Sequence, residues 1–587
     1  MAERTSKEAS GLPISRFDLS LNFTDIQWAF GEVNNAREQE IEKFEEEFAA
    51  FIGVKKAIYM ASARAGLYLV LQSLNLAPRS RVLIPAWTHH SIPAAIIAAG
   101  LQPCLVDIRK KTWTMAPELI SEDDWDGVSV IIITHMYGCP APAPELLAEA
   151  KKRNIFVIED CAQGFGAEID GKKAGSFGDA AIFSFALTKN FTTLGGGMVV
   201  FQNEKIGSTC AQLMQDAKIT ANTSMYPTLL KAAAMWVGTS KFGFLLGPYP
   251  FLALGWTFQG RDMLHEGFRE EVNTSIPDIH RKPSPLQAAL GRRLLKWSVE
   301  QNEYRTKNGL KLIELFEKEH IPNLSFSGAP NYGTSVFMSF VINYENSEKL
   351  GKQLFNKGID TSPGYLAPVH QQPIFAESCR YFGTLPNTNF LARTQLHIPV
   401  YPRLQEPDLR RIVAKCREAV EYVEHYYSDE TKYRSLPSME KEKALTDPDA
   451  AKASAKAEPP AESKNPNLQL MTGDKAAPAS HKPASLHESQ PLPINRVPPR
   501  LNRSASPSQP PAAPPAGRPG AHNSGEYPAA GTAVPSARPA GAVPPPPPRR
   551  IPTLNRASAP SADRGGLPQP PQRPTSLQSR LNRGDRE

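Results

Sequence analysis

IFVIEDCAQG at residues 155–164 and AAIFSFALTKNFTTLGGGM at residues 180–198 are the two stretches that decide the fold of this chain. In each of them a run of apolar residues ends at a polar side chain, Asp160 in the first and Ser184 in the second. Lys189 and a triple glycine follow the second run. Short apolar runs bounded by turn residues are typical of buried strands, so the two stretches predict strands with an acid and a lysine near their ends.

The same pattern continues along the chain on both sides of these stretches. Between about residues 20 and 300, short apolar runs alternate with amphipathic segments. We expect a helix at 144–150 and strands at 82–84, 104–106, 128–133, 155–158 and 181–183. Strands that alternate with helices predict an α/β fold with a mostly parallel sheet, which binds its ligands at the carboxyl ends of the strands. We expect Asp160 just past the end of its strand, at this edge.

A smaller unit is expected after residue 300. A long helical pattern covers residues 297–319, an apolar run at 336–342 predicts a strand, and residues 406–427 predict a final amphipathic helix. The predicted parts of the chain are an N-terminal arm (1–20), a large domain (21–300), a small α/β domain (301–428) and a tail (429–587).

The tail differs from the rest of the chain in composition and charge. Proline, alanine, serine and arginine dominate it, so it cannot bury enough apolar area to offset chain entropy, and we expect disorder. Residues 441–587 carry 20 Lys and Arg against 11 Asp and Glu, whereas the first 440 residues carry 46 against 48. The near-neutral body argues against specific nucleic-acid binding. The proline run at 544–548 favours an unidentified protein partner for the tail.

The cysteines and the first residues of the chain indicate whether the protein holds a metal and in which cell compartment we expect it. The six cysteines are scattered without a Cys-x-x-Cys pair, which argues against a metal site or a disulfide framework. The N-terminal residues hold no apolar run of the secretory type. We therefore expect a cytoplasmic protein without a bound metal.

An apolar insert at about residues 222–260 stands out within the large domain. Its second half, FGFLLGPYPFLALGWTFQG at 242–260, carries no charge over a length that nearly spans a bilayer. Pro248 and Pro250 interrupt any spanning helix. Two interpretations stay open, namely an insert packed on the body or on a second subunit, and a peripheral contact with a membrane surface.

Lys189 and Asp160 together form the pair of groups that pyridoxal phosphate requires. A lysine amine forms the imine that holds this cofactor. A buried carboxylate keeps the pyridine nitrogen protonated, because a nearby opposite charge favours the charged form. A surface lysine and a helix-capping aspartate are the ordinary alternatives. The place of Lys189 between a buried strand and a triple glycine favours the catalytic role.

Over roughly residues 20 to 425 the chain resembles the DegT/DnrJ/StrS family of pyridoxal-phosphate-dependent sugar aminotransferases. The resemblance is carried by Asp160-Cys161-Ala162-Gln163, by Gly175-Ser176-Phe177-Gly178-Asp179, and by Ser184-Phe185 through Lys189-Asn190 to the triple glycine. It implies the type I aminotransferase fold, with a large mostly parallel-sheet domain and a small C-terminal α/β domain. It also implies a homodimer whose active sites are shared between subunits.

The resemblance assigns further residues to the cofactor. Gln163 matches the position that reaches the phenolic oxygen of the cofactor, and Ser184 matches a serine whose hydroxyl binds its phosphate. Ala63 and Arg64 stand where the family has Gly-Thr in a phosphate-binding turn, so the threonine hydroxyl is lost. Our own inference is that Arg64 contacts the phosphate by charge instead.

Two histidines complete the expected site. His89 aligns with the aromatic residue that stacks on the cofactor ring, although Trp87, two residues earlier, is the more obvious aromatic. His280 replaces the family asparagine that reaches the phosphate in the neighbouring subunit, and Lys282 replaces its arginine. Because of these departures, the family's usual contacts with the nucleotide sugar do not carry over directly to this chain.

The resemblance implies transfer of an amino group, with glutamate as the expected donor, to a nucleotide-linked keto-sugar for polysaccharide or glycan assembly. Family members that became sugar dehydratases carry histidine in place of Lys189, so the lysine favours transamination. Two alternatives stay open: a transaminase of a non-sugar ketone, and a regulatory or scaffold protein that keeps the cofactor without turnover.

Overall fold

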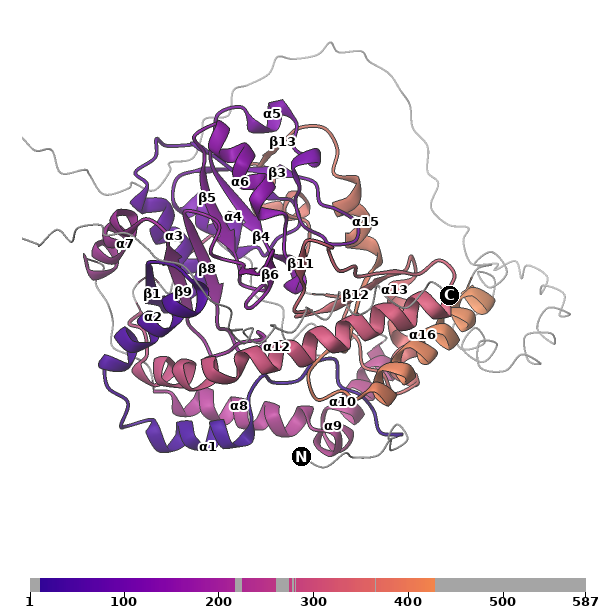
Figure 1. Ribbon diagram of the computed structural model, residues 1–587. Helices are drawn as coiled ribbons and strands as arrows, with labels where there is room; N and C mark the ends of the chain where they lie inside the picture. The colour runs from indigo at the N-terminus through magenta and orange to yellow at the C-terminus, as the bar shows by residue number, and fades with distance from the viewer. Residues whose placement is uncertain are drawn as a thin grey trace, which may run out of the picture. The chain divides into compact units, whose positions relative to one another are not determined.

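The computed structural model describes residues 11–216, 224–259, 274–276, 279, 281–364 and 366–427. Its centre is an eight-stranded sheet in the order β1-β9-β8-β5-β4-β2-β3-β13 (Figure 1). β9 runs antiparallel to both of its neighbours, and the other strands are parallel to one another. The strands are β1 (Lys56–Met60), β2 (Arg81–Pro85), β3 (Gln102–Val106), β4 (Val128–Thr134), β5 (Phe156–Asp160), β8 (Ala180–Ser184), β9 (Gly197–Phe201) and β13 (Arg380–Tyr381).

Both faces of this sheet are buried. Successive residues of a strand point to opposite faces, and here the residues on each face belong to an apolar core. Val82 and Ile84 of β2 belong to one apolar cluster, whereas Leu83 between them belongs to another. On the first face, α3 (Ala63–Ser73) contacts both α4 (Ser91–Ala98) and α7 (Glu204–Asp216). α6 (Ala143–Lys152) contacts β4 and β5, and α2 (Gln39–Ile52) contacts β1.

A smaller antiparallel sheet, in the order β10-β12-β14, carries its own apolar core. That core lies among the C-terminal half of α12, α13 and α16. The elements are α12 (Pro285–Glu319), β10 (Ser325–Phe326), β12 (Phe340–Asn343), α13 (Ser347–Asn356), α15 (Pro386–Thr394), β14 (Gln395–Ile398) and α16 (Glu406–Tyr427). The remaining short elements are α1 (Phe23–Glu32), η1 (Pro117–Leu119), α5 (Glu122–Trp125), η2 (Met136–Gly138), β6 (Glu168–Ile169), β7 (Lys172–Lys173), β11 (Gly333–Thr334), η5 (Val369–Gln371) and α14 (Pro373–Ala376).

Two expected elements differ from the structure. The strand expected at 336–342 begins only at Phe340, because Phe337 has a left-handed backbone with φ of 42° and Val336 donates its N–H to the carbonyl of Gly138. The helix expected from residue 297 begins at Pro285, where the fixed φ of proline suits the first helical position and Ser284 accepts from the N–H of Gln287. α12 thus runs continuously from the core of the large sheet into that of the small one.

Residues 224–259, the described part of the apolar insert, form three helices and a π-helical turn: α8 (Tyr226–Thr239), α9 (Lys241–Leu246), α10 (Pro248–Leu254) and η3 (Gly255–Gln259). α8 lies beside α1 at the lower edge of Figure 1, with α9 and α10 at its right end. In the described parts of the chain, every helix is too short or too polar to cross a bilayer.

Candidate functional site

The polar residues of the expected site meet at one edge of the large sheet. β1, β2, β4, β5 and β8 are parallel, so their carboxyl ends lie along the same edge. Asp160 and Ser184 are the last residues of β5 and β8. β9 starts at this edge, where Gly197 is the partner of Ser184.

Asp160 and Lys189 form the charged centre of the edge. The buried Asp160 carboxylate accepts the N–H of Ala162 at 3.0 Å. Burial raises the pKa of Asp160, although the Ala162 N–H, Lys189 and His135 act to lower it. Lys189 lies in the turn after β8 and is half-buried, with its backbone N–H on the carbonyl of Ala186 at 3.0 Å. A carboxylate with a raised pKa facing a lysine is characteristic of functional sites.

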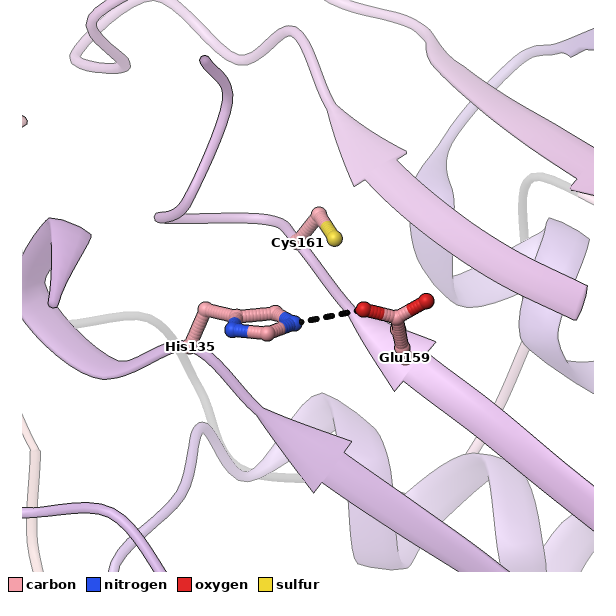
Figure 2. Close-up of side chains that lie close together, drawn as sticks. All are labelled: His135, Glu159 and Cys161. Atoms are coloured by element: carbon pink, nitrogen blue, oxygen red, sulfur yellow. Dashed lines mark hydrogen bonds and ion pairs between the residues drawn. The ribbon is translucent and has the colours of Figure 1, made fainter. Parts of the chain in front are cut away.

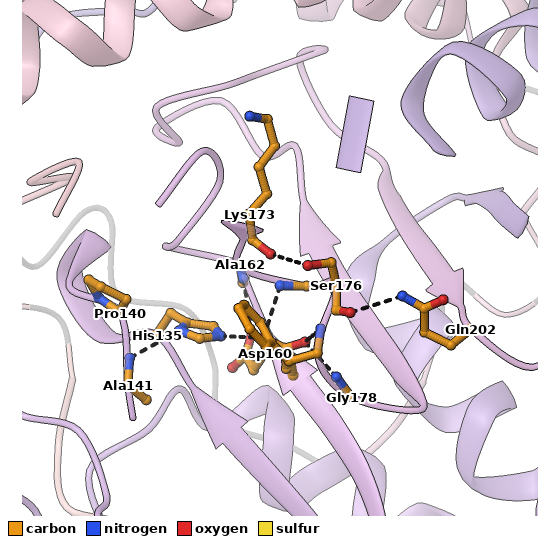
Figure 3. A network of polar contacts seen from close by, with 12 residues as sticks. His135, Pro140, Ala141, Asp160, Ala162, Lys173, Ser176, Gly178 and Gln202 are labelled. Atoms are coloured by element: carbon orange, nitrogen blue, oxygen red, sulfur yellow. Dashed lines mark hydrogen bonds and ion pairs between the residues drawn. The ribbon is translucent and has the colours of Figure 1, made fainter. Parts of the chain in front are cut away.

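Glu159, the residue before Asp160, has a carboxylate that accepts hydrogen bonds at both oxygens. Figure 2 shows its contact with His135, and Figure 3 shows the polar network that includes His135, Asp160 and Gly178. His135 lies 3.0 Å from Glu159 through Nε2, and both side chains are fully buried. The N–H groups of Gly175, Phe177 and Gly178 also donate to the Glu159 carboxylate at 2.8–2.9 Å. Burial alone would raise the pKa of Glu159, but His135 and the backbone donors bring it below its usual value.

Cys161 joins this pair to form a group with the composition of a metal site. One ligand atom from each of His135, Glu159 and Cys161 lies within 4.8 Å of the others (Figure 2). His135 Nδ1 accepts the N–H of Ala141 at 3.1 Å, which leaves the ring proton on Nε2 for Glu159. Burial and the two carboxylates raise the pKa of the Cys161 thiol well above its usual value. Hydrogen bonds therefore already use the His135 and Glu159 atoms that a metal would need, and the raised pKa of Cys161 keeps its thiol protonated.

The N-terminus of α3 opens at the same edge. Ser62 caps the helix by accepting the N–H of Ala65, and Ala63 is its first residue. A Cβ on Gly197 would lie 2.5 Å from the backbone nitrogen of Ala63, so only glycine allows this close approach. The free N–H groups and the dipole of such a helix end attract an anion.

Arg64 adds a cation to this helix end. Its Nη2 donates to His90 Nε2 at 3.3 Å. The rings of His90 and His89 are 4.2 Å apart, and His89 Nδ1 accepts the N–H of Ser91 at 3.2 Å. The structure therefore brings Arg64 of α3 together with the two histidines that directly precede α4.

Gln163 and Trp87 both contact Tyr137, in the loop after β4. The buried Gln163 accepts the N–H of Tyr137 at 3.2 Å, where Tyr137 has a left-handed φ of 54°. Trp87 is fully buried and donates its indole N–H to the Tyr137 hydroxyl at 3.0 Å, which in turn donates to Gln395 of β14. Trp87 is thus held in a core between the two sheets.

Two buried hydroxyls at this edge lack a hydrogen-bond partner among the described residues. They belong to Thr88, which follows β2, and to Thr134, which ends β4. Thr88 is 1% exposed and Thr134 is 3% exposed. Because buried hydroxyls are nearly always hydrogen-bonded, these two atoms have hydrogen-bonding capacity left for a polar ligand or an ordered water at this edge.

The sequence prediction covered only part of the site. His280 lies outside the described residues, and Lys282 forms an ion pair with Glu38 at 2.9 Å. His135, Glu159 and Thr88 were not among the predicted site residues. Each follows or ends an apolar run that predicted a strand, so a search for polar residues at the ends of all predicted strands would have found them.

The model of the DegT/DnrJ/EryC1/StrS aminotransferase family matches residues 25–230 and 261–417. The unmatched residues between these ranges, 231–260, hold most of α8 and all of α9 and α10.

Several curated relatives cover a similar part of the chain. UDP-N-acetyl-3-dehydro-alpha-D-glucosamine 3-aminotransferase of Acidithiobacillus ferrooxidans is 28% identical over 380 residues, which cover 64% of this chain and 87% of the relative. dTDP-3-amino-3,4,6-trideoxy-alpha-D-glucose transaminase of Streptomyces venezuelae is 25% identical, with 66% and 88% covered. The crystal structure of a DegT DnrJ EryC1 StrS aminotransferase from Brucella abortus matches with a TM-score of 0.53 and 20% identity, covering 67% of this chain and 94% of the other.

Proposed function

The chain belongs to the DegT/DnrJ/EryC1/StrS aminotransferase family, and from this premise we propose that it transfers an amino group from glutamate to a nucleotide-linked keto-sugar. The names of two relatives support the substrate class, because each describes an enzyme of UDP- or dTDP-linked amino sugars. The proposed setting is polysaccharide or glycan assembly, with pyridoxal phosphate as the cofactor.

The residues at the sheet edge fit this cofactor. Asp160 is a buried carboxylate with a raised pKa, and a cationic pyridine nitrogen would stabilise its charged form. The capped N-terminus of α3 and the cation of Arg64 suit a phosphate. The unpaired hydroxyls of Thr88 and Thr134 would gain a polar partner at the same edge.

We assign the roles in the following way. Lys189 would bind the cofactor covalently, and Asp160 would hold its ring nitrogen in the protonated form. Ser184, with the backbone of Ala63 and the side chain of Arg64, would bind the phosphate, and His89 would lie against the ring. Gln163 would reach the phenolic oxygen with its amide nitrogen, since its oxygen already accepts from Tyr137.

The bound cofactor supplies an electron sink for the bonds of the donor's α-carbon. The protein must then move protons. Lys189 Nζ would take the α-proton of glutamate and later return a proton to the sugar carbon that receives the amine. We expect ping-pong kinetics, because the amine stays with the protein between the two half-reactions.

The observation that carries this proposal is the buried Asp160 carboxylate with Lys189 as its charged neighbour. We would measure amine transfer from glutamate to a panel of nucleotide keto-sugars, with Lys189→Ala as the test and Lys172→Ala, an exposed lysine of β7, as the control. We expect Lys189→Ala to lose both the transfer and the visible absorbance of the bound cofactor, and Lys172→Ala to keep both. Full activity in Lys189→Ala would refute the assignment.

We further propose a homodimer whose active sites each use His280 from the other subunit. Mixed dimers of Lys189→Ala and His280→Ala subunits test this arrangement. In a shared site, one of the two sites in such a dimer carries both substitutions and the other carries neither. Recovery of activity on mixing is therefore expected, and mixtures no more active than either variant alone would contradict the sharing.

A further inference from the structure

We propose that the face formed by α8, α9 and α10 docks on the surface of an anionic phospholipid bilayer. These helices occupy residues 226–254, most of which the family model leaves unmatched. The inference does not depend on the proposed transaminase reaction.

The first observation is a concentration of exposed apolar side chains. Among the described residues, seven of the thirteen large apolar side chains with high exposure lie between residues 224 and 259. Leu246 is 79% exposed, Phe242 70% and Leu230 62%. Side chains this exposed stand clear of their neighbours. The seven are Tyr226, Leu230, Val237, Phe242, Leu246, Phe251 and Leu254.

The second observation is that these side chains form stripes along the helices. On α8, Tyr226, Leu230 and Val237 recur at intervals of four and seven residues, which places them on one helix face. On α9, the exposed Phe242 and Leu246 are four residues apart, whereas Phe244 between them is buried. Each helix therefore has one face toward the protein and an apolar face toward solvent.

The buried faces hold the insert against the body of the protein. Phe244 and Leu252 cluster with Phe355 of α13, and the Tyr249 hydroxyl donates to the Phe355 carbonyl at 3.0 Å. The exposed stripes are therefore fixed in place before any partner arrives, which lowers the entropy cost of docking.

The charges of the insert favour anionic lipid over a second protein. Residues 224–259 hold no Asp or Glu, and their charged residues are Lys231 and Lys241. Lys231 is exposed, and the Lys241 side chain is 49% exposed while lying 3.4 Å from Asp408. Protein interfaces are depleted of lysine, whereas lysine beside exposed Leu and Phe is the composition of helices that lie in the plane of a membrane.

The test is flotation of the full-length, cofactor-loaded protein with vesicles. Vesicles of phosphatidylcholine with a minority of phosphatidylglycerol are compared with vesicles of phosphatidylcholine alone. We expect flotation with the anionic vesicles, weakened by salt, and a decrease of about tenfold or more in the double variant Phe242→Ser, Leu246→Ser. The control is Val299→Ser with Ile374→Ser, two exposed apolar residues outside the insert, which should float as the wild type does.

The other outcomes overturn the proposal. Unchanged flotation of the Phe242, Leu246 variant would assign the binding to another part of the chain, such as the basic tail. Absence of flotation in the wild type, with a molar mass in light scattering that falls by half in the variant, would assign the face to a second subunit. Melting temperatures of all variants would establish that they are folded.

Discussion

Glu159 and Asp160 are adjacent buried carboxylates whose pKa values shift in opposite directions. The difference follows from their hydrogen bonds. Three backbone N–H groups and His135 donate to Glu159, whereas the Asp160 carboxylate accepts the N–H of Ala162. Because hydrogen bonds to the charged form offset burial, Glu159 is a stable anion that supports the site, and Asp160 is a costly anion that needs a cationic partner.

At the residue scale, we expect Asp160→Asn to stabilise the cofactor-free protein near neutral pH and to abolish transamination. An acid whose folded pKa is raised contributes stability below its unfolded pKa and loses this contribution as the pH rises through the folded value. The stability advantage of the variant should therefore grow as the pH rises from 3.8, the ordinary value. Unfolding of the cofactor-free proteins in urea across this pH range measures it, and an equal stability at every pH would contradict the role of burial.

Glu159→Gln should have the opposite effect on stability. The amide nitrogen would face backbone donors that now point at a carboxylate, so we expect a loss of about 3 kcal/mol in the free energy of unfolding. The folded pKa of Glu159 is lowered, so its contribution is present above 4.5 and is lost as the pH falls through the folded value. The difference between wild type and variant should therefore shrink in acid.

Glu118→Gln is the matched control for this experiment. Glu118 also has a lowered pKa, through its hydrogen bond with Arg109, but its side chain is 54% exposed. Water screens such a pair, so we expect a change below about 1 kcal/mol. A larger effect at Glu118 than at Glu159 would show that hydrogen bonds to the buried carboxylate are not the source of stability.

At the scale of elements, the sequence predicted the strands at the site well and the loops between them poorly. The runs at 128–133 and 155–158 lie within β4 and β5 to within two residues, and the α/β fold is confirmed by the matching structures. A continuous apolar run suffices as the signal there, because both faces of these strands are buried. The run at 336–342 failed because its first residues form long-range hydrogen bonds with the loop after β4, which local pattern does not encode.

The apolar insert shows the same limit of sequence analysis. Its composition allowed two interpretations, because composition alone does not tell which positions of a helix are buried and which are exposed. Leu252 is fully buried and Leu254, on the same helix, is 55% exposed.

We expect Leu252→Ala to cost about 2–4 kcal/mol of local stability and to speed hydrogen exchange throughout α9 and α10. Leu254→Ala, which removes the same atoms from an exposed position, should leave the exchange of these helices unchanged. Equal exchange in both variants would mean that contact with α13 does not hold the insert.

At the scale of the whole molecule, the apolar cores that position the site lie within residues 14–423. The sequence-based expectation of a disordered tail falls on residues outside the described part of the chain. The charge of the chain nevertheless divides sharply, because the first 440 residues carry 46 Lys and Arg against 48 Asp and Glu. We therefore expect that removing the residues after 440 takes away the positive net charge of the protein and leaves its catalytic activity intact.

Deletion of residues 441–587 tests this separation. Since segments poor in apolar residues add little to a packed core, we expect the melting temperature to change by less than about 2 °C. Cofactor absorbance per subunit and the number of subunits per molecule should stay unchanged. The net charge should change sign, because the deleted residues carry 20 Lys and Arg against 11 Asp and Glu. The truncated protein should thus elute earlier from a cation exchanger at pH 7, while calorimetry records the stability. A fall of many degrees in the melting temperature would mean that the tail packs on the body, and the predicted boundary would be wrong.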